Sequence, residues 1–300
     1  MSIWVAGEVL IDMLPTGDVV GGGPANTAKA LARLGYEVDF IDGISSDTNG
    51  VNARKALERD GVGLALSLKS EKPTCTATLI LDSHGGAQYE FFIKETATFD
   101  FNTSWLPDPS RLKPSARHIG TLATIIEPGA TALFDWVVRV GEFAPIIFDP
   151  NIRPSVLDDR AIYASAVEKW VSIASIIKVS DDDLKWLYPN ETLDEVAHRW
   201  IEQGVSCVVV TRGVHGLIGF TEHGMEEVDG AKVTVVDTVG AGDTVGAIVV
   251  EGVIAHSVAG LQGHVLNEVL HKAAIAAGIT CSRAGAEPPH KHELIDAMGQ

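Results

Sequence analysis

The residues with the clearest chemical potential are a carboxylate, Asp243, and the glycine-rich turn directly before it. A β-branched run at Val233–Asp237 predicts a strand that enters the turn, and an apolar stretch at Thr244–Ile254 predicts a helix that leaves it. Glycines let several backbone N–H groups converge at the helix N-terminus, where the helix dipole adds positive potential. The turn is therefore expected to form an anion hole that stabilises a phosphoryl group during transfer.

Asp243 would lie beside a phosphate bound in that turn. A carboxylate in this place can accept the proton of an attacking hydroxyl, which makes Asp243 a candidate general base. The helix N-terminus should keep it ionised at neutral pH. The alternative is a structural role as the N-cap of the helix, which Asp fills commonly.

Two other nucleotide-binding motifs do not fit this segment. A dinucleotide fingerprint needs glycine where Val245 stands and an acidic residue about 20 positions later, where only Gln262 and Gly263 are near. A P-loop needs Gly-Lys-Ser or Gly-Lys-Thr, and neither tripeptide occurs in the chain. A dehydrogenase is therefore the weakest of the functions considered.

A second glycine-rich segment, Gly21–Gly23, precedes a helix predicted over Pro24–Leu34, whose proline suits a first helical turn. Asn26 would lie near the start of that helix, where its amide could donate to and accept from sugar hydroxyls; the alternative is a solvated polar residue. Asp12 is predicted to close the first strand. Because ligands of doubly wound sheets bind beyond the carboxyl ends of strands, Asp12 and Asn26 could share one pocket, although Asp12 alone could be a loop carboxylate.

The elements that would position these residues alternate along the chain. Strands that alternate with helices predict a parallel sheet covered on both faces. The predicted strands are Ile3–Leu10, Val38–Ile44, Ile146–Phe148, Ile176–Val179, Val205–Thr211 and Val233–Asp237. The further predicted helices are Gly50–Arg59, Arg160–Ile173 and Asp181–Tyr188.

The stretch Thr74–Asp100 departs from this alternation. It contains two β-rich runs around a Gly85–Gly86 turn, with no helical pattern between them. Bare strand edges are a liability, so a hairpin here is expected to cover a site as a lid or to form a dimer contact.

Composition restricts the partners. The chain has 300 residues, 46% of them hydrophobic, and a formal net charge of −17, which disfavours binding to nucleic acid or to an anionic membrane surface. Cys75, Cys207 and Cys281 are distant from one another and form no paired motif, as expected for a reducing compartment. The N-terminus lacks the features of a signal peptide, so a cytoplasmic location is predicted.

GGGPAN at 21–26 and DTVGAGD at 237–243, in this order, resemble the two signatures of the ribokinase-like (PfkB) carbohydrate kinases. The similarity extends over nearly all 300 residues and includes GEVLID at 7–12, GTLATIIEPG at 120–129, DPNIR at 149–153, IKVSDDDL at 177–184 and VVTRGVHG at 209–216. Among the subgroups, the segments EVLID, DPNIR and LATIIEP are most similar to fructokinases.

The resemblance implies a single domain over 1–300, built as a ribokinase-like three-layer Rossmann-type α/β sandwich. The central sheet would be mostly parallel, and a small β-strand lid would be formed mainly by about 74–100 with the segment around 13–20. The implied reaction is transfer of the γ-phosphate of ATP, with Mg²⁺, to a primary sugar hydroxyl, and the similarity to fructokinases implies conversion of fructose to fructose 6-phosphate.

The resemblance also assigns roles to individual residues. Gly240, Ala241, Gly242 and Asp243 match the anion hole and the base; Asp12, Gly22, Gly23 and Asn26 match sugar contacts. Arg153 matches a position that reaches the substrate or the transferring phosphate, the alternative being a surface ion pair. Thr211, Gly213 and Gly216, with Gly240 and Gly242, match the nucleotide site.

Two metal assignments follow from the same resemblance. Asp183 matches the carboxylate of an Asn-x-x-Glu element associated with Mg²⁺, although Ser180 replaces the asparagine and so puts the placement of metal and water in doubt. Asp237, with Thr238 and the backbone carbonyls around Ser282–Ala286, matches a monovalent cation region, which would make the enzyme responsive to K⁺.

Several functions stay open from the sequence. The same fold could phosphorylate 2-keto-3-deoxygluconate, ribose or a nucleoside. A protein of another class, a regulator that binds sugar or nucleotide without turnover, is disfavoured because a pure binder needs no base beside the phosphate. A homodimer joined through the Thr74–Asp100 hairpin is also predicted.

Overall fold

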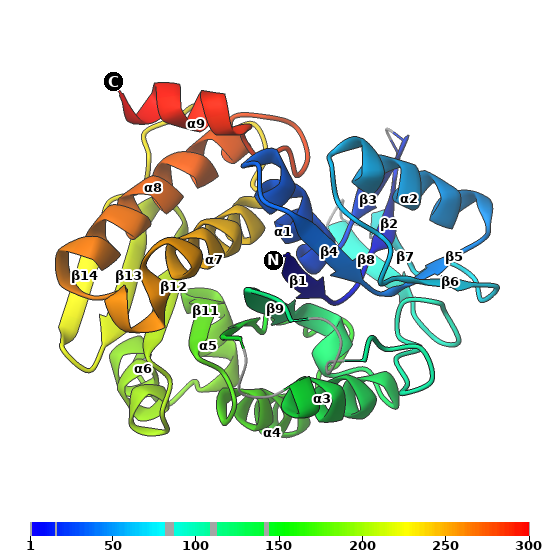
Figure 1. Ribbon diagram of the computed structural model, residues 1–300, viewed down its shortest axis with the longest axis horizontal. Helices are drawn as coiled ribbons and strands as arrows, with labels where there is room; N and C mark the ends of the chain where they lie inside the picture. The colour runs from blue at the N-terminus through cyan, green and yellow to red at the C-terminus, as the bar shows by residue number, and fades with distance from the viewer. Residues whose placement is uncertain (1, 16, 82–86, 109–112, 141–143, 300) are drawn as a thin grey trace.

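An eight-stranded sheet forms the centre of the computed structural model, which describes residues 2–15, 17–81, 87–108, 113–140 and 144–299 (Figure 1). Its strands are β1 Ile3–Ala6, β4 Val38–Ile41, β9 Ala116–Gly120, β10 Ile146–Asp149, β11 Ile176–Ser180, β12 Cys207–Thr211, β13 Leu217–Thr221 and β14 Gly224–Val228. They follow the order β14-β13-β12-β11-β10-β9-β1-β4. The strands from β4 to β12 are parallel, and β13 and β14 continue the sheet antiparallel at one edge.

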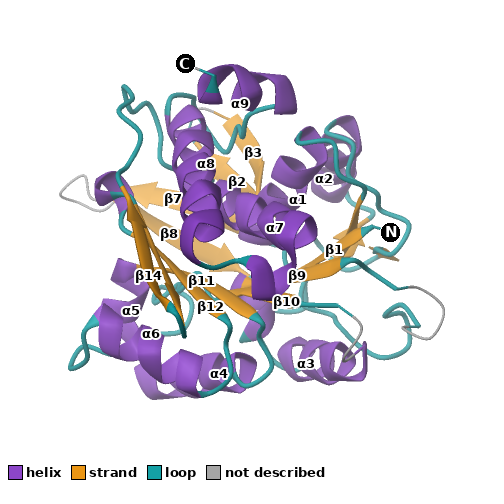
Figure 2. Cartoon of the chain, turned by 60° about the vertical axis from the view of Figure 1, so that its left-hand side comes forward, coloured by secondary structure: helices purple, strands orange, loops and turns teal. Residues whose placement is uncertain are grey.

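Helices cover both faces of this main sheet (Figure 2). One face carries α1 Gly23–Arg33, α7 Ala241–Gly260 and α8 Gly263–Cys281, with α9 Lys291–Met298 packed on α8. The other face carries α3 Gly129–Val140, α4 Arg160–Val171, α5 Asp181–Leu187 and α6 Leu193–Glu202. The predicted α/β sandwich with a mostly parallel sheet is therefore confirmed.

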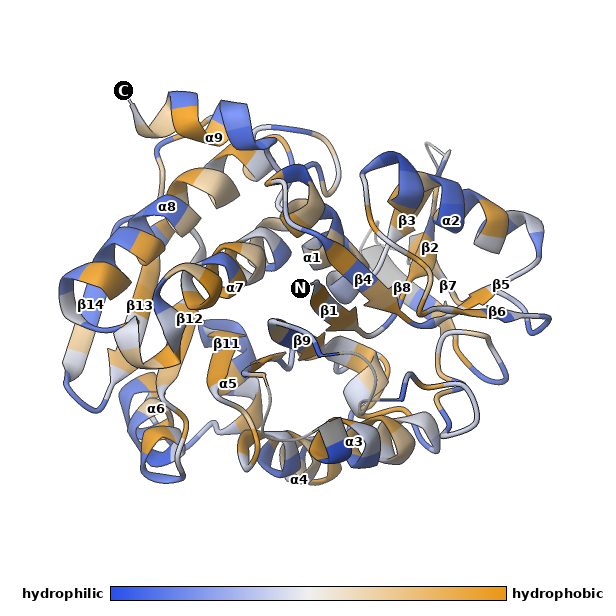
Figure 3. Ribbon diagram, viewed as in Figure 1, coloured by the Kyte–Doolittle hydropathy of each residue, from blue (hydrophilic) through white to orange (hydrophobic). Residues whose placement is uncertain are grey.

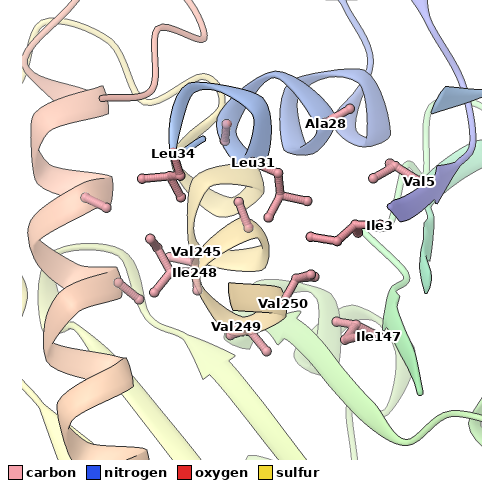
Figure 4. Close-up of a cluster of buried hydrophobic side chains, with 14 of the residues drawn as sticks. Ile3, Val5, Ala28, Leu31, Leu34, Ile147, Val245, Ile248, Val249 and Val250 are labelled. Atoms are coloured by element: carbon pink, nitrogen blue, oxygen red, sulfur yellow. The ribbon is translucent and has the colours of Figure 1, made fainter. Parts of the chain in front are cut away.

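Alternation along each strand divides the core into two layers. Ile3 and Val5 of β1 pack with α1 and α7, whereas Trp4, between them, packs with the aromatic cluster under α3 and α4. Figure 4 shows the first layer, where side chains of α1 and α7 face those of β1 and β10. Figure 3 shows the same pattern as apolar faces turned inward. Burial of each such large side chain contributes about 1.5–3 kcal/mol.

The helix α7 is apolar almost throughout. Among the described residues it is the one helix with the length and composition of a membrane span. It packs between α1 and α8 in the core, and most of its first half is buried, so its apolar character is explained by packing. The cytoplasmic location stays a prediction.

A second, four-stranded sheet, here called the small sheet, stands beside the carboxyl edge of the main sheet. It consists of β2 Leu10–Leu14, β3 Gly17–Gly21, β7 Thr76–Leu81 and β8 Ala87–Phe92 in the order β3-β2-β7-β8. The antiparallel pair β7 and β8 is the predicted hairpin, whose Gly85–Gly86 turn lies outside the described residues. Described residues of segment 13–20 belong to β2 and β3, and the role of this sheet as a lid stays a prediction.

Shorter elements connect the two sheets. The helix α2 Thr48–Arg59 packs on β2 and β3 and on a two-stranded sheet of β5 Gly43–Ser45 and β6 Leu68–Ser70. The 3₁₀ turns η1 Thr121–Thr124 and η3 Gly213–His215 follow β9 and β12. Each turn directly follows a strand of the main sheet, so both lie at its carboxyl edge.

Candidate active site

Two cavities lie at the carboxyl edge of the main sheet and meet beneath the first turn of α7. The small-sheet cavity, of about 800 Å³, includes residues of β2 and β8; the α8 cavity, of about 520 Å³, includes residues of α8 and the ends of β11 and β12. Both cavities are lined by Asn151, Arg153, Lys178, Thr238 and Gly242. A ligand in one cavity can therefore reach a ligand in the other at this junction.

Asp243 lies in the first turn of α7 and lines the small-sheet cavity. Its Oδ2 accepts a hydrogen bond from Asn26 Nδ2 at 2.8 Å, and its backbone carbonyl accepts one from Thr27 Oγ1 at 3.3 Å. These partners begin α1, so the N-termini of α1 and α7 are joined at the cavity. Within the described part of the chain Oδ1 has no hydrogen-bond partner, which leaves this oxygen for a ligand.

Burial raises the pKa of Asp243 to about 6, even though Lys178, the Asn26 hydrogen bond and Arg153 act to lower it. The nearby carboxylate of Asp149 acts in the same direction as burial. Asp243 is thus mostly ionised at pH 7, as the sequence predicts. Its pKa nevertheless lies above the ordinary value, because desolvation outweighs the favourable charges around it.

The turn at the start of α7 has the geometry that an anion hole requires, and the anion hole itself stays a prediction. Gly240 is the N-cap residue with φ +79°, a left-handed conformation that glycine adopts without strain. The Ala241 N–H donates to the Thr238 carbonyl at 3.3 Å and so is not free. The N–H groups of Gly240 and Gly242 have no acceptor among the residues described, and they remain as donors for an anion.

The structure corrects the position of Asp12. The predicted strand Ile3–Leu10 breaks at Gly7, whose φ of +151° lets the chain leave the main sheet. Asp12 therefore belongs to β2 of the small sheet and does not close the first core strand. It still lines the same cavity as Asn26, and burial raises its pKa to about 6, opposed by Arg153.

Gly22 and Gly23 line the small-sheet cavity where α1 begins, and Gly22 has φ +109°. A β-carbon on Gly23 would lie 2.8 Å from Asn151 Nδ2, 2.9 Å from Thr121 Oγ1 and 3.2 Å from Asp243 Oδ1. The absence of a side chain at position 23 thus lets three polar groups converge on one point.

Thr121 and Asn151 are site residues that sequence reasoning missed. Both line the small-sheet cavity, both have positive φ (59° and 40°), and Asn151 Nδ2 donates to Thr121 Oγ1 at 3.4 Å. Strained backbone of this kind persists only where the surrounding structure enforces it, and it clusters at functional sites. The sequence signal that could have identified them is their position, because each polar residue follows shortly after the end of a core strand, β9 or β10.

Glu8 was also missed. Its side chain is buried, lines the small-sheet cavity and accepts from the Ala123 N–H at 3.3 Å. Burial raises its pKa to about 7. An acidic residue that interrupts an apolar run was the signal in the sequence.

Arg153 lines both cavities, as the predicted contact with substrate or phosphate requires. Its Nη1 donates to the carbonyls of Ile152 at 3.0 Å and Asn151 at 3.4 Å. The alternative, a surface ion pair, finds no support, since no carboxylate lies within 4.0 Å of its guanidinium in the described segments. The backbone contacts hold the cation at the junction.

The α8 cavity contains the predicted nucleotide residues Thr211, Gly213 and Gly216. The expected strand at Val233–Asp237 is wrong: the segment is an extended loop that lines this cavity with Val233 and Val235. Among the described residues no strand pairs with it; instead the Val236 N–H donates to the Cys281 carbonyl at 2.8 Å, at the end of α8. Val235 is 52% exposed, so its β-branched side chain is free to cover a flat apolar ligand.

Asp183 lines the α8 cavity, and its carboxylate also forms a capping box with Ser180 at the start of α5. Its Oδ1 accepts from the Ile152 N–H at 3.2 Å. Ser180, which stands where the Asn-x-x-Glu element has its asparagine, thus holds the Asp183 carboxylate in position through the capping box. No group of three His, Cys, Asp or Glu side chains suited to a metal occurs in the ranges described.

Asp237 joins two loops. Its Oδ1 accepts from the Val239 N–H at 3.0 Å and its Oδ2 from the Gly285 N–H at 2.9 Å. The loop of the anion hole is therefore tied to segment 282–286, which is the region predicted to bind a monovalent cation.

The mostly parallel sheet places a carboxylate, two free N–H groups and two joined cavities at its carboxyl edge, an arrangement that suits phosphoryl transfer to a small molecule. The chain belongs to the pfkB family of carbohydrate kinases, whose family model matches residues 14–293. It is a carbohydrate kinase. Within the family, it is 34% identical to a fructokinase of Rhizobium leguminosarum bv. trifolii over 251 residues, which cover 81% of this chain and 76% of the relative.

Solved structures agree with this assignment of the fold. A fructokinase of Xylella fastidiosa with bound ATP has a TM-score of 0.87 at 25% identity and covers 100% of this chain and 99% of its own. A fructokinase double mutant of Vibrio cholerae O395, bound to fructose, ADP and a potassium ion, has a TM-score of 0.86 at 24% identity and covers 99% of this chain and 98% of its own.

Proposed function

We propose that the chain transfers the γ-phosphate of ATP to the primary hydroxyl of fructose and produces fructose 6-phosphate. The observation that carries this proposal is the place of Asp243, whose free Oδ1 faces the small-sheet cavity beside the junction with the α8 cavity. The fructokinases among the relatives support fructose as the acceptor.

The small-sheet cavity would hold the sugar. Asp12 and Asn26 offer oxygen and amide groups to its hydroxyls, while Gly22 and Gly23 allow it close to the backbone. Glu8 adds a third carboxylate to this wall, together with Asp12 and Asp243. These three carboxylates outnumber the two cations of the same cavity, Arg153 and Lys178, and this balance favours a neutral polyol over a sugar acid such as 2-keto-3-deoxygluconate, because like charges repel in a buried site.

The α8 cavity would hold ATP, with the adenine against the valines of segment 230–236 and the phosphates directed toward Gly242. Asp243 Oδ1 takes the hydroxyl proton while the hydroxyl oxygen forms a bond to the γ-phosphorus and the bond to the β–γ bridging oxygen of ADP breaks. The Gly240 and Gly242 N–H groups stabilise charge on the phosphoryl oxygens.

The donors near the phosphate path suit Mg²⁺, which usually binds through one or two carboxylates, the nucleotide phosphates and water. Asp183 supplies a hard oxygen on the wall of the α8 cavity and would hold the ion. When bound, Mg²⁺ would neutralise part of the negative charge on the ATP phosphates. Asp237 and the carbonyls of 282–286 would hold K⁺, and this would stabilise the loop that contains the anion hole.

The acceptor is tested by comparing kcat/KM for fructose, ribose, 2-keto-3-deoxygluconate and a nucleoside with ATP·Mg²⁺. We expect fructose to be preferred. Preference for another compound would show that the protein is a kinase of the same family with a different acceptor. Binding of ATP and sugar without turnover of any acceptor would contradict the enzymatic proposal and favour a regulator.

The titration of Asp243 predicts a pH dependence. Only the deprotonated carboxylate accepts a proton, so kcat/KM should rise with pH up to about 6 and level off above it. Glu8, with a pKa of about 7, and Asp12, with a pKa of about 6, line the same cavity. The pH profiles of kcat/KM for Glu8→Gln and Asp12→Asn distinguish these two groups from Asp243. If Asp243 is the base, the rise in kcat/KM near pH 6 should persist in both variants. Loss of that rise in either variant would assign it to the replaced carboxylate.

A homodimer joined through the small sheet is part of the proposal. Asp12 and Phe91 line the cavity, whereas Met13, Ile80 and Phe92 belong to the opposite face by strand register and are 37%, 44% and 51% exposed. Light scattering is expected to give a dimer that Phe92→Asp weakens. A monomeric wild type would contradict it.

A further inference from the structure

Lys178 occupies a place that the roles proposed above do not explain. It is the third residue of β11, its side chain is 5% exposed, and it lines both cavities. A β-carbon added to Gly242 would lie 2.9 Å from Lys178 Nζ. The ammonium group therefore lies directly beneath the first turn of α7, at the junction that a transferred phosphoryl group would cross.

The charge of Lys178 is retained despite its burial. Its Nζ lies 3.0 Å from Asp149 Oδ2, and Asp149, on the neighbouring strand β10, is itself buried. Burial alone would lower the pKa of Lys178. The attraction of Asp149, Asp243 and Asp183 and the hydrogen bond to Asp149 outweigh it, so the pKa is raised above the ordinary value. The site holds a fixed cation at neutral pH.

The hydrogen bonds of this ammonium are incomplete. An ammonium group has three N–H donors, and Lys178 uses one of them on Asp149 within the residues described. A buried ion pair with only a structural role would be expected to satisfy its remaining donors, because unsatisfied buried charge is costly. Two donors are left at the junction of the cavities. Within the residues described they form no hydrogen bond with the unpaired Asp149 Oδ1 or Asp243 Oδ1, so they can bind a ligand.

An anion with several oxygens fits these donors. The unpaired N–H of Gly242 belongs to the turn above the ammonium, and the Arg153 guanidinium lines both cavities as well. These three donor groups all line the junction of the two cavities. A phosphoryl group in transfer carries its charge on equatorial oxygens, which such donors stabilise most in the transition state.

We infer that Lys178 is a further catalytic residue, which binds the equatorial oxygens of the phosphoryl group while that group moves between the two cavities. Asp149 is the positioning residue that holds the ammonium in place. This inference rests on the proposed phosphoryl transfer, but it does not depend on the identity of the acceptor.

The test compares wild type with Lys178→Met, which keeps much of the volume and removes the charge. We expect kcat to fall by about 10²–10³-fold, the usual effect of removing one such donor, while KM for fructose and Kd for ADP change by less than about threefold. Lys272→Met is the matched control. Lys272 Nζ forms an ion pair with Glu251 at a distance of 2.6 Å, and neither residue lines either cavity. The kcat of this control should equal that of wild type.

A second readout separates catalysis from structure. ADP with aluminium fluoride mimics the planar phosphoryl group, and wild type should bind this pair in the presence of fructose far more tightly than ADP alone. Lys178→Met should lose that gain. If the single variant does not fold, the same measurements are made on the double variant Lys178→Met with Asp149→Asn, which leaves no unpaired charge at this pair.

A kcat within about fivefold of wild type, or full retention of the aluminium fluoride gain in a folded variant, would overturn the inference. Parallel loss of ADP and fructose binding would also overturn it, since it would indicate a structural role. If wild type phosphorylates a different sugar, the same ratios are measured with that sugar. If wild type phosphorylates none, the proposed function fails, and the analogue measurement still tests Lys178 by itself.

Discussion

Replacement of Asp243 by asparagine is expected to lower kcat by about 10²–10⁴-fold, the contribution of a general base. An asparagine side chain keeps an oxygen that can accept from Asn26 Nδ2, so the link between α1 and α7 is preserved. The loss should therefore appear in kcat, and KM for fructose should change little. Initial rates of ADP release with fructose measure both quantities.

The same variant should be at least as stable as wild type at pH 8. The folded-state pKa of Asp243, about 6, is above its ordinary value of 3.8, so the native state binds the proton more tightly than the unfolded state. Stability from this group is present at low pH and is lost as pH rises through about 6. At pH 8 the ionised carboxylate costs on the order of 3 kcal/mol, which asparagine avoids.

Asp135→Asn is the matched control, because Asp135 is exposed on α3 and lines neither cavity. It should change neither kcat nor Tm. A folded Asp243→Asn protein with kcat within about tenfold of wild type would exclude Asp243 as the base.

Replacement of Gly240 by alanine is expected to lower kcat at least about 10²-fold, through displacement of the anion hole. A β-carbon at this position would lie 2.6 Å from Ala286 Cβ and 2.8 Å from Ala286 Cα, and an L residue at φ +79° is also strained. Either the turn or segment 282–286 must move. The N–H groups of Gly240 and Gly242 then no longer converge on the phosphoryl group.

Gly263→Ala provides the control for backbone strain alone. Gly263 also has positive φ, +50°, and a β-carbon there meets nothing within 4 Å. Both variants should lose about 1–2 kcal/mol of stability from the left-handed conformation, but only Gly240→Ala should lose kcat. Equal kcat in the two variants would show that the turn does not set the rate.

The sequence predicts the parts of the site that depend on local backbone chemistry. GAGD and GGGPAN each place glycines at the start of a helix, and both segments form helix N-termini in this chain. The strand and helix alternation likewise predicts β1, β4, β10, β11 and β12 of the main sheet, because buried parallel strands are continuous apolar runs, whereas β9, β13 and β14 were not predicted. These features are local, so no tertiary information was needed.

Other parts depend on which strand lies beside which. Gly7 turns the chain out of the main sheet, and this moves Asp12 into the small sheet. Val233–Asp237 has the composition of a strand, but the sheet already ends at β14, so the segment forms a cavity wall. Local propensity cannot reveal either event, because both are decided by long-range packing.

Lys178 is an active-site candidate that its position in the sequence could have indicated. A lysine inside the apolar strand IIKVS must either reach solvent or find a buried partner, and strand alternation places it on the face covered by α7. Its partner Asp149 lies at the end of the neighbouring strand. Charged residues within predicted core strands are therefore worth examining as candidates for active-site groups.

The central claim is that this protein makes a fructose phosphate from fructose and ATP. The most direct measurement is ³¹P NMR of a reaction of purified protein with fructose and ATP·Mg²⁺. We predict stoichiometric ADP and a single new phosphomonoester, fructose 6-phosphate, formed only when both substrates are present. ATP left unconsumed, or hydrolysed to ADP and inorganic phosphate without a sugar phosphate, would contradict the account.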